Sequence, residues 1–247
     1  MTSTYVLGCR VDAVGPDEAV TTIAALAAAP APAIVVTLGV EMVMEARRNV
    51  RFRALVNRSA LSLCDTVGIL LASRLRRGPL RERVTGVDLI GPLAARSARS
   101  GDVRLFLFGA APGVAERAAD ALAREHPGVR VVGTRNGYFA PEESAAIARS
   151  IAQSGANVVL VGLGSPKQEF WLEEHLAGTG ASVGIGVGGS FDVLAGAVVR
   201  APLLLRRAGL EWLYRLVREP ARWRRQLALP RFAVAVLREA FSPQGNK

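Results

Sequence analysis

A run of four apolar residues at positions 158–161 (VVLV) constrains the fold more than any other stretch of this chain. The polar Asn157 precedes the run, and Gly162 and Gly164 follow it. A short, unbroken apolar run that ends at glycines is typical of a strand buried on both faces of a parallel sheet. The glycines would let the chain turn sharply at the carboxyl end of this strand.

The residues after this predicted strand favour a helix. Ser165 is placed to cap the helix, and Pro166 suits its first position. Lys167, Gln168 and Glu169 then fall in the first turn, at the edge where open α/β sheets bind their ligands. A polar binding site is one interpretation of this turn, and a well-capped helix with solvated charges is the other.

Similar apolar runs alternate with helical segments along the chain, and they predict a doubly wound α/β fold with a mostly parallel sheet. After a hairpin arm at residues 5–11, the expected strands are residues 33–38, 60–64, 104–108, 129–132, 158–161 and 181–187. The uncharged stretch 19–40 contains Pro30 and Pro32, which favour a surface helix followed by a strand over a membrane span.

The positive charge of the chain is concentrated near its C-terminal end. The formal net charge is +10. Residues 200–247 hold eleven basic and three acidic residues, whereas the remaining residues hold twenty basic and eighteen acidic residues. This change predicts an α/β domain at 1–199 and an arginine-rich amphipathic appendage at 200–247. Tryptophan and arginine interleave in the appendage, which suits a membrane interface, although packing helices with solvated arginines are the alternative. A localised basic segment implies an anionic partner: phosphates, nucleic acid or an acidic membrane surface.

The remaining composition predicts a soluble, cytoplasmic protein. Cys9 and Cys64 have neither metal-ligand spacing nor the pattern of a disulfide framework, so we expect a reducing compartment. The first residues lack a basic region followed by an apolar one, so no signal peptide is expected.

Three aspartates are candidates for acid–base chemistry. Asp65 and Asp192 each follow an apolar run and are flanked by small residues, so both could reach the crevice at the end of the sheet. Asp88 lies three residues after Thr85, where it could instead form part of a helix cap. Each of the three has a structural alternative as a capping residue.

The motifs for cofactors and metals are weak or missing. Gly184, Gly186 and Gly189 match a GxGxxG pattern, but they follow the last predicted strand rather than the first, so a nucleotide-dependent oxidoreductase rests on this pattern alone. The two histidines, His126 and His175, fall on different predicted helices, and there is no Asp-x-Asp pair to hold a metal on a nucleotide diphosphate. We therefore expect no metal and no cofactor, and we expect arginines and helix N-termini to neutralise any bound diphosphate.

Four segments, in this order and spacing, resemble one family. They are RVTGVDL (83–89), VGLGSPKQE (161–169), GVGGSFD (186–192) and RAPLLLRRAGLEWLYRLVREPARW (200–223). Over residues 37–225 the chain is similar to the WecB/TagA/CpsF glycosyltransferases. The resemblance implies a Rossmann-like fold and transfer of a sugar from a UDP-sugar with inversion. The best-known members add N-acetylmannosamine to a polyprenyl-diphosphate-linked N-acetylglucosamine in cell-wall polymer synthesis.

The resemblance also implies roles for individual residues. Asp65 matches the proposed general base, which deprotonates the acceptor hydroxyl. The other matched positions are the pocket residues Thr37, Arg83 and Gln168, the nucleotide-associated Tyr138 and Asp192, and Arg215, Arg222 and Arg225 of the appendage. The appendage is expected to cover the site at the inner face of the cell membrane and to hold the diphosphate. The implied partners are a UDP-sugar, a polyprenyl-diphosphate-linked acceptor and an anionic membrane surface, without nucleic acid; a homo-oligomer is left open.

Two segments depart from the family pattern. The family usually has Thr-x-Asn where this chain has Thr37, Leu38 and Gly39, and Pro-Asp-Gly where this chain has 64–66 (CDT). The identities of the sugar and of the acceptor therefore stay open. Besides the oxidoreductase, a non-catalytic binder of anionic membranes or nucleic acid is the remaining alternative.

Overall fold

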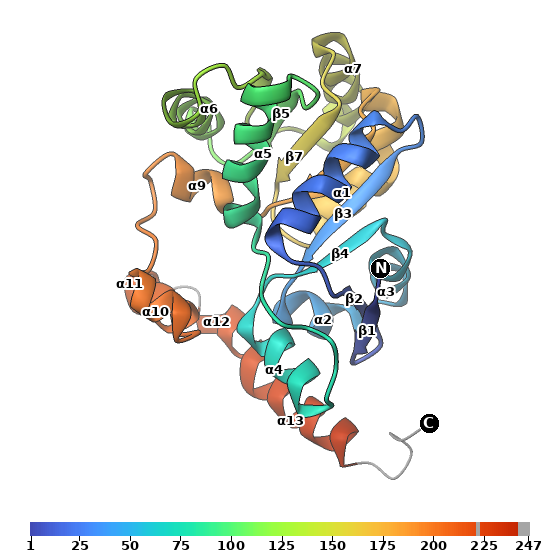
Figure 1. Cartoon of the computed structure of the whole chain (residues 1–247), viewed down its shortest axis with the longest axis vertical. Coiled ribbons are helices and arrows are strands. Elements are labelled where there is room, and N and C mark those ends of the chain that lie inside the picture. The colour runs from blue at the N-terminus through green and yellow to red at the C-terminus, as the bar shows by residue number, and fades with distance from the viewer. Residues whose placement is uncertain (221–222, 242–247) are drawn as a thin grey trace.

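A parallel six-stranded sheet with helices on both faces forms the centre of the molecule (Figure 1). The computed structural model describes residues 1–220 and 223–241, without the side chains of Arg207, Arg215, Arg224 and Arg225. The strands are β3 (Ala33–Leu38), β4 (Leu61–Cys64), β5 (Leu105–Gly109), β6 (Val131–Arg135), β7 (Val158–Gly162) and β8 (Val183–Gly186), in the spatial order β4-β3-β8-β7-β5-β6. The predicted α/β fold class and its parallel sheet are confirmed.

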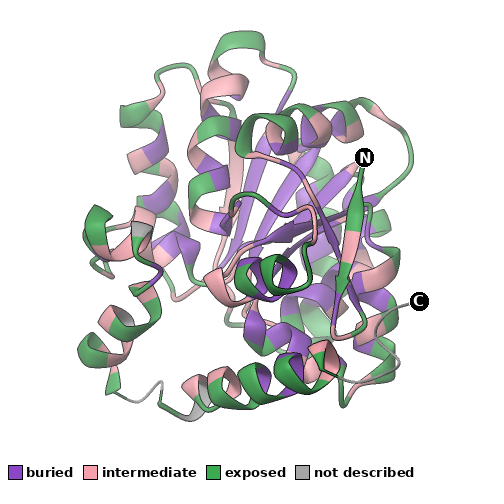
Figure 2. Ribbon diagram, turned by 60° about the horizontal axis from the view of Figure 1, so that its bottom comes forward, coloured by how far each residue is buried: buried purple, intermediate pink, exposed green. Residues whose placement is uncertain are grey.

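Both faces of the sheet are buried, which explains why its strands are continuous apolar runs. In β3, Val35 packs into the core on one face, whereas Val36 and Leu38 pack into the core on the other. Figure 2 shows the strands as a buried layer and the helices around them with exposed outer surfaces. The edge strand β6 is only partly buried, and it begins two residues later than predicted, after a turn at Gly128.

The helices divide between the two faces. One face is covered by α1 (Pro16–Ala28), α5 (Gly86–Ser100), α6 (Val114–Glu125) and α9 (Ser190–Leu194). The other face is covered by α2 (Val40–Ala46), α3 (Val50–Arg58), α4 (Val67–Leu75), α7 (Ser144–Ser154), α8 (Lys167–His175) and the 3₁₀ turns η1 (Pro141–Glu143) and η2 (Leu176–Thr179). The expected start of α8 was wrong by one residue, because Pro166 precedes the helix and Ser165 does not cap it.

An N-terminal hairpin lies against the β4 edge of the sheet. Its strands, β1 (Ser3–Val6) and β2 (Cys9–Asp12), are antiparallel. The buried carboxylate of Asp12 accepts hydrogen bonds from the Ser3 hydroxyl (2.7 Å) and from the Ser62 amide in β4 (2.8 Å), and it pairs with Arg10 (3.1 Å). This carboxylate therefore joins the hairpin to the sheet.

The C-terminal segment consists of α10 (Leu203–Arg207), α11 (Glu211–Arg218), α12 (Trp223–Gln226) and α13 (Ala228–Ala240). Phe232 and Val236 of α13 are buried in the same core as Val36 and Leu38, so this helix packs on the α/β layers. The division into 1–199 and 200–247 stays a prediction. In the described part of the chain, no helix has both the length and the apolarity to cross a membrane.

Candidate active site

A cavity of about 310 Å³ opens at the carboxyl ends of the β3, β4, β7 and β8 strands. Open α/β sheets bind ligands at this edge, because the loops that follow the strands converge there. Four of the predicted site residues, Thr37, Asp65, Arg83 and Gln168, line this one cavity.

Asp65 comes directly after β4 and is held by the start of the next helix. Its Oδ1 atom accepts a hydrogen bond from the amide of Gly86, the first residue of α5 (3.1 Å). A helix N-terminus favours negative charge nearby, so this contact orients the carboxylate at the cavity wall. Burial raises the pKa of the neighbouring Cys64 thiol to about 12, which keeps that thiol neutral.

Thr37 and Gln168 make hydrogen bonds that shape the cavity. The Thr37 hydroxyl donates to the carbonyl oxygen of Gly186 (2.8 Å), and Gln168 Oε1 accepts from the amide of Gly188 (3.0 Å). Gln168 Nε2 donates to the buried Glu169 carboxyl group (2.7 Å), whose pKa is raised by burial. Gln168 therefore fixes the loop after β8 from within α8.

The GxGxxG glycines make room for α8. A Cβ atom on Gly184 would lie 2.3 Å from a Leu172 methyl group, and one on Gly186 would lie 2.6 Å from Gln168 Nε2. Both glycines are therefore required by side chains of the protein itself. This packing accounts for two of the three glycines in the pattern on which the oxidoreductase alternative depended.

The C-terminal segment forms one wall of the cavity. Gly209, Glu211, Trp212, Gln226 and Leu229 all line it. Arg83 also lines the cavity and donates from Nη2 to the carbonyl oxygen of Arg206 (3.0 Å), which joins the α/β layers to α10. Gly209 has a φ of +73° and approaches α4 closely, because a Cβ atom there would lie 2.8 Å from Val67 Cγ2.

Asp88, near the start of α5, has a structural role, which was one of the two interpretations of its position in the sequence. Arg200 binds both carboxylate oxygens (2.6 and 2.7 Å), and the Thr85 hydroxyl donates to Oδ2 (2.7 Å). Burial favours the neutral acid, but these hydrogen bonds outweigh it and hold the pKa of Asp88 below its usual range. Asp88 thus ties the start of the C-terminal segment to α5.

Two of the predicted site residues are not brought to the cavity, and the side chains of three lie outside what the structure describes. Asp192 lies in α9 and does not line it, and Tyr138, which is 71% exposed, follows the edge strand β6. Arg222 lies outside the described residues, as do the side chains of Arg215 and Arg225. The roles of these five residues stay predictions. Lys167, which the sequence placed at the same edge of the sheet, does not line the cavity. Its ammonium nitrogen lies 4.6 Å from the centre of the Phe139 ring.

Several residues of the cavity were not identified from the sequence. They are Glu41, Thr66, Ser190, Trp212 and Gln226. Glu41 carried the same signal as Asp65, a carboxylate shortly after a buried strand, whereas Trp212 and Gln226 reach the site only through the path of the C-terminal segment. Among the described residues, no group of three or more His, Cys, Asp or Glu side chains could hold a metal ion.

Comparison with known proteins gives consistent matches over the chain. The glycosyl transferase WecG/TagA/CpsF family profile matches residues 4–246. An N-acetylglucosaminyldiphosphoundecaprenol N-acetyl-beta-D-mannosaminyltransferase of Bacillus spizizenii (strain W23) is 37% identical over 206 residues, which cover 83% of this chain and 79% of the relative. A protein of the same name from Bacillus subtilis (strain 168) is 33% identical over 207 residues, which cover 84% of this chain and 80% of the relative.

Proposed function

The chain belongs to the WecG/TagA/CpsF family of glycosyl transferases, the family recognised above as WecB/TagA/CpsF, and from this membership we propose its reaction. The enzyme transfers N-acetylmannosamine or a related hexose from a UDP-sugar to a polyprenyl-diphosphate-linked sugar, with inversion, in cell-wall or exopolysaccharide synthesis. The names of the two Bacillus relatives support this acceptor and this sugar. The observation that carries the proposal is the position of Asp65, held by the start of α5 in a cavity that the C-terminal segment walls off.

The proposed mechanism is a single displacement. The acceptor hydroxyl attacks the anomeric carbon of the donor sugar while Asp65 takes the hydroxyl proton. A bond forms between the acceptor oxygen and the anomeric carbon, and the bond from that carbon to the UDP phosphate oxygen breaks. The departing diphosphate carries the charge that develops, and Arg83 in the cavity wall would stabilise it, together with Arg215, Arg222 and Arg225.

We also propose that the enzyme is peripheral on the inner face of the cell membrane, where a polyprenyl acceptor is held. Large apolar side chains are unusually exposed in the C-terminal segment, among them Leu204 (79%), Val217 (71%) and Phe241 (79%). Apolar side chains beside arginines suit the boundary between headgroups and acyl chains.

The test is replacement of Asp65 by Asn, which keeps the shape of the side chain and removes its basicity. Transfer from the UDP-sugar to the lipid-linked acceptor should fall about 100-fold or more, with UDP affinity unchanged. Asp120→Asn, an exposed substitution in α6, is the control and should keep full activity. Equal rates for the Asp65→Asn variant and the control would remove Asp65 as the base.

A further inference from the structure

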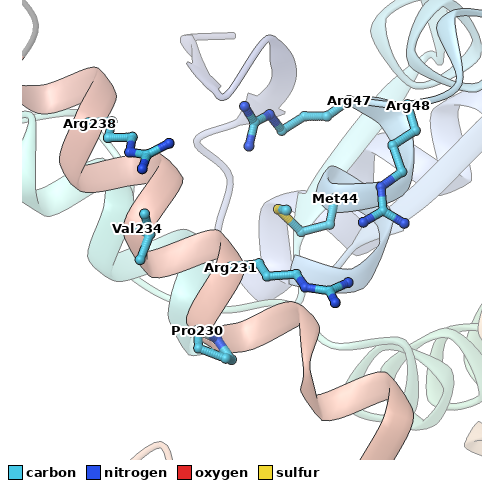
Figure 3. A pocket seen from close by; sticks show the side chains of 7 residues that line it. All are labelled: Met44, Arg47, Arg48, Pro230, Arg231, Val234 and Arg238. Atoms are coloured by element: carbon cyan, nitrogen blue, oxygen red, sulfur yellow. The ribbon is translucent and has the colours of Figure 1, made fainter.

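A second hollow, of about 590 Å³, lies between the end of α2 and the helix α13, apart from the active-site cavity (Figure 3). It is lined by four arginines, Arg47, Arg48, Arg231 and Arg238, and by the apolar side chains of Met44, Pro230 and Val234. We call it the α2–α13 groove. Figure 3 shows the guanidinium groups of Arg47 and Arg238 directed toward one another across it.

Among the residues that the structure describes, these four guanidinium groups form no ion pair and no side-chain hydrogen bond, although Glu45 lines a neighbouring hollow together with Arg48 and Arg231. Some arginines elsewhere are paired, as Arg76 is with Glu239 (3.0 Å) and Arg96 with Asp102 (2.6 Å). Arg231 also lies in the first turn of α13, where a helix disfavours a cation. Converging guanidinium groups bind phosphate oxygens well, so the groove is complementary to a phosphate-type anion.

The α13 helix next to these arginines has two apolar faces. Phe232 and Val236 are buried in the core. Val234, Leu237 and Phe241 are 49%, 48% and 79% exposed, and their spacing of three and four residues places them on one stripe. A helix that only covers a core needs one apolar face. An exposed apolar stripe beside arginines suits a ligand with an anionic head and an apolar tail.

We propose that the α2–α13 groove binds the phosphate headgroup of an anionic phospholipid while the exposed stripe of α13 enters the acyl region. This inference rests on the proposed function, since it identifies where the enzyme meets the membrane that carries its acceptor. The site uses Arg47 and Arg48 of the α/β layers together with α13, and it shares no residue with the active-site cavity.

The position of the groove would orient the enzyme on the membrane. The groove shares Met44, Arg48 and Arg231 with a neighbouring hollow of about 240 Å³. That hollow shares Glu41, Met42 and Ser165 with the active-site cavity. A membrane held at the groove would therefore lie beside a series of neighbouring hollows that share lining residues, the last of which is the cavity of Asp65.

The test is binding of the full chain to vesicles of phosphatidylglycerol and phosphatidylcholine, measured by co-sedimentation. Removing two groove charges with Arg47→Gln/Arg238→Gln should weaken binding about 25-fold, since each arginine near an anionic surface contributes about 1 kcal/mol and 1.4 kcal/mol is tenfold. The matched control, Arg124→Gln/Arg149→Gln, removes the same charge from exposed positions on α6 and α7. Equal binding of the two double variants would overturn the proposal.

A site-specific probe keeps the proposal testable if a variant folds poorly. Cys9 and Cys64 are buried, so a polarity-sensitive fluorophore can be attached selectively to Val234→Cys. Its emission should shift to the blue with phosphatidylglycerol vesicles, whereas a probe at the exposed Ala123→Cys in α6 should not change. The same emission from both probes would contradict insertion of the stripe.

Two further measurements distinguish failure of the lipid assignment from failure of the proposed function. Inorganic pyrophosphate without lipid should bind weakly; tight binding that Arg47→Gln/Arg238→Gln abolishes would assign the groove to a soluble diphosphate and overturn the lipid assignment. Transfer to a short-chain, water-soluble acceptor should be the same in the groove variant and the wild type. Absence of that transfer in the wild type would count against the proposed function, whatever the result with vesicles.

Discussion

Gly39 and Thr66 stand side by side next to the carboxylate of Asp65. A Cβ atom on Gly39 would lie 3.3 Å from the Thr66 methyl carbon and 3.9 Å from Asp65 Oδ2. These are two of the three positions at which the chain departs from the family pattern, which has Asn and Gly here; the third is Cys64, where the family has Pro. A side chain at position 39 and the methyl group at position 66 would compete for the same space. We therefore interpret the loss of the Asn side chain at position 39 and the gain of the Thr side chain at position 66 as one coupled exchange.

This exchange predicts a coupling between the two positions. Gly39→Asn alone should lower kcat/KM, because the new side chain crowds Thr66 beside the base. Adding Thr66→Gly should recover much of the loss, with a coupling energy of about 1 kcal/mol in a double-mutant cycle. Kinetics of the wild type, both single variants and the double variant with the UDP-sugar donor give the four rates required. Simple additivity would show that the positions act independently.

The sequence identified some of the residues in the cavity, for a definite reason. Asp65 could be predicted because it directly follows a buried strand, and strand ends meet at one edge of a parallel sheet. The hydrogen-bond partners of Gln168 could not be predicted, because Gly188 lies twenty residues further along the chain. The hydrogen bond from Gly188 to Gln168 thus depends on packing rather than on local pattern.

At the scale of elements, a buried carboxylate is one of the contacts that hold the N-terminal hairpin. Asp12→Ala should reduce the free energy of unfolding by about 3 kcal/mol, because it leaves the Ser62 amide without its partner and Arg10 without its carboxylate. Urea denaturation measures this loss. Asp17→Ala, an exposed change in the first turn of α1, should cost less than about 1 kcal/mol. Similar losses in the two variants would contradict a structural role for Asp12.

The strands with two buried faces were predictable, whereas the edge strand was less so. Residues 158–161 are apolar throughout, and residues 33–38 are apolar apart from Thr37, because helices cover both sides of β3 and β7. The partly exposed β6 has no such requirement, and its start is determined by the turn before it. Similarly, the start of α8 depends on local backbone geometry at Pro166 that residue preferences alone did not reveal.

At the scale of the whole molecule, the turn at Gly209 holds the C-terminal segment over the cavity. In Gly209→Ala, the left-handed φ of +73° costs about 1 kcal/mol, and the new methyl group also collides with Val67. We expect the segment to shift and transfer activity to fall about tenfold. Gly155→Ala is a matched control, since Gly155 has a φ of +71° and open space around it. Gly209→Ala should lose at least as much thermal stability as Gly155→Ala, and equal activities of the two variants would show that the close approach is unimportant.

The placement of the C-terminal segment was only partly predictable. Its charge indicated an anionic partner, but charge alone does not indicate which surface a segment covers. The surface that the segment covers is set by the Asp88–Arg200 pair at one end and by the burial of Phe232 and Val236 at the other. Both contacts join residues far apart in the sequence.

The central pairing of the sheet has a consequence for biosynthesis. The β3 strand pairs with β8, and the Thr37–Gly186 hydrogen bond joins residues 149 positions apart. At about 5–20 residues per second, a ribosome needs roughly 7–30 s to supply that partner after β3 has been made. During that interval one hydrogen-bonding edge of an apolar strand is unpaired in the nascent chain, which makes it a natural substrate for chaperones. The catalytic cavity can form only once nearly all of the polypeptide has been translated.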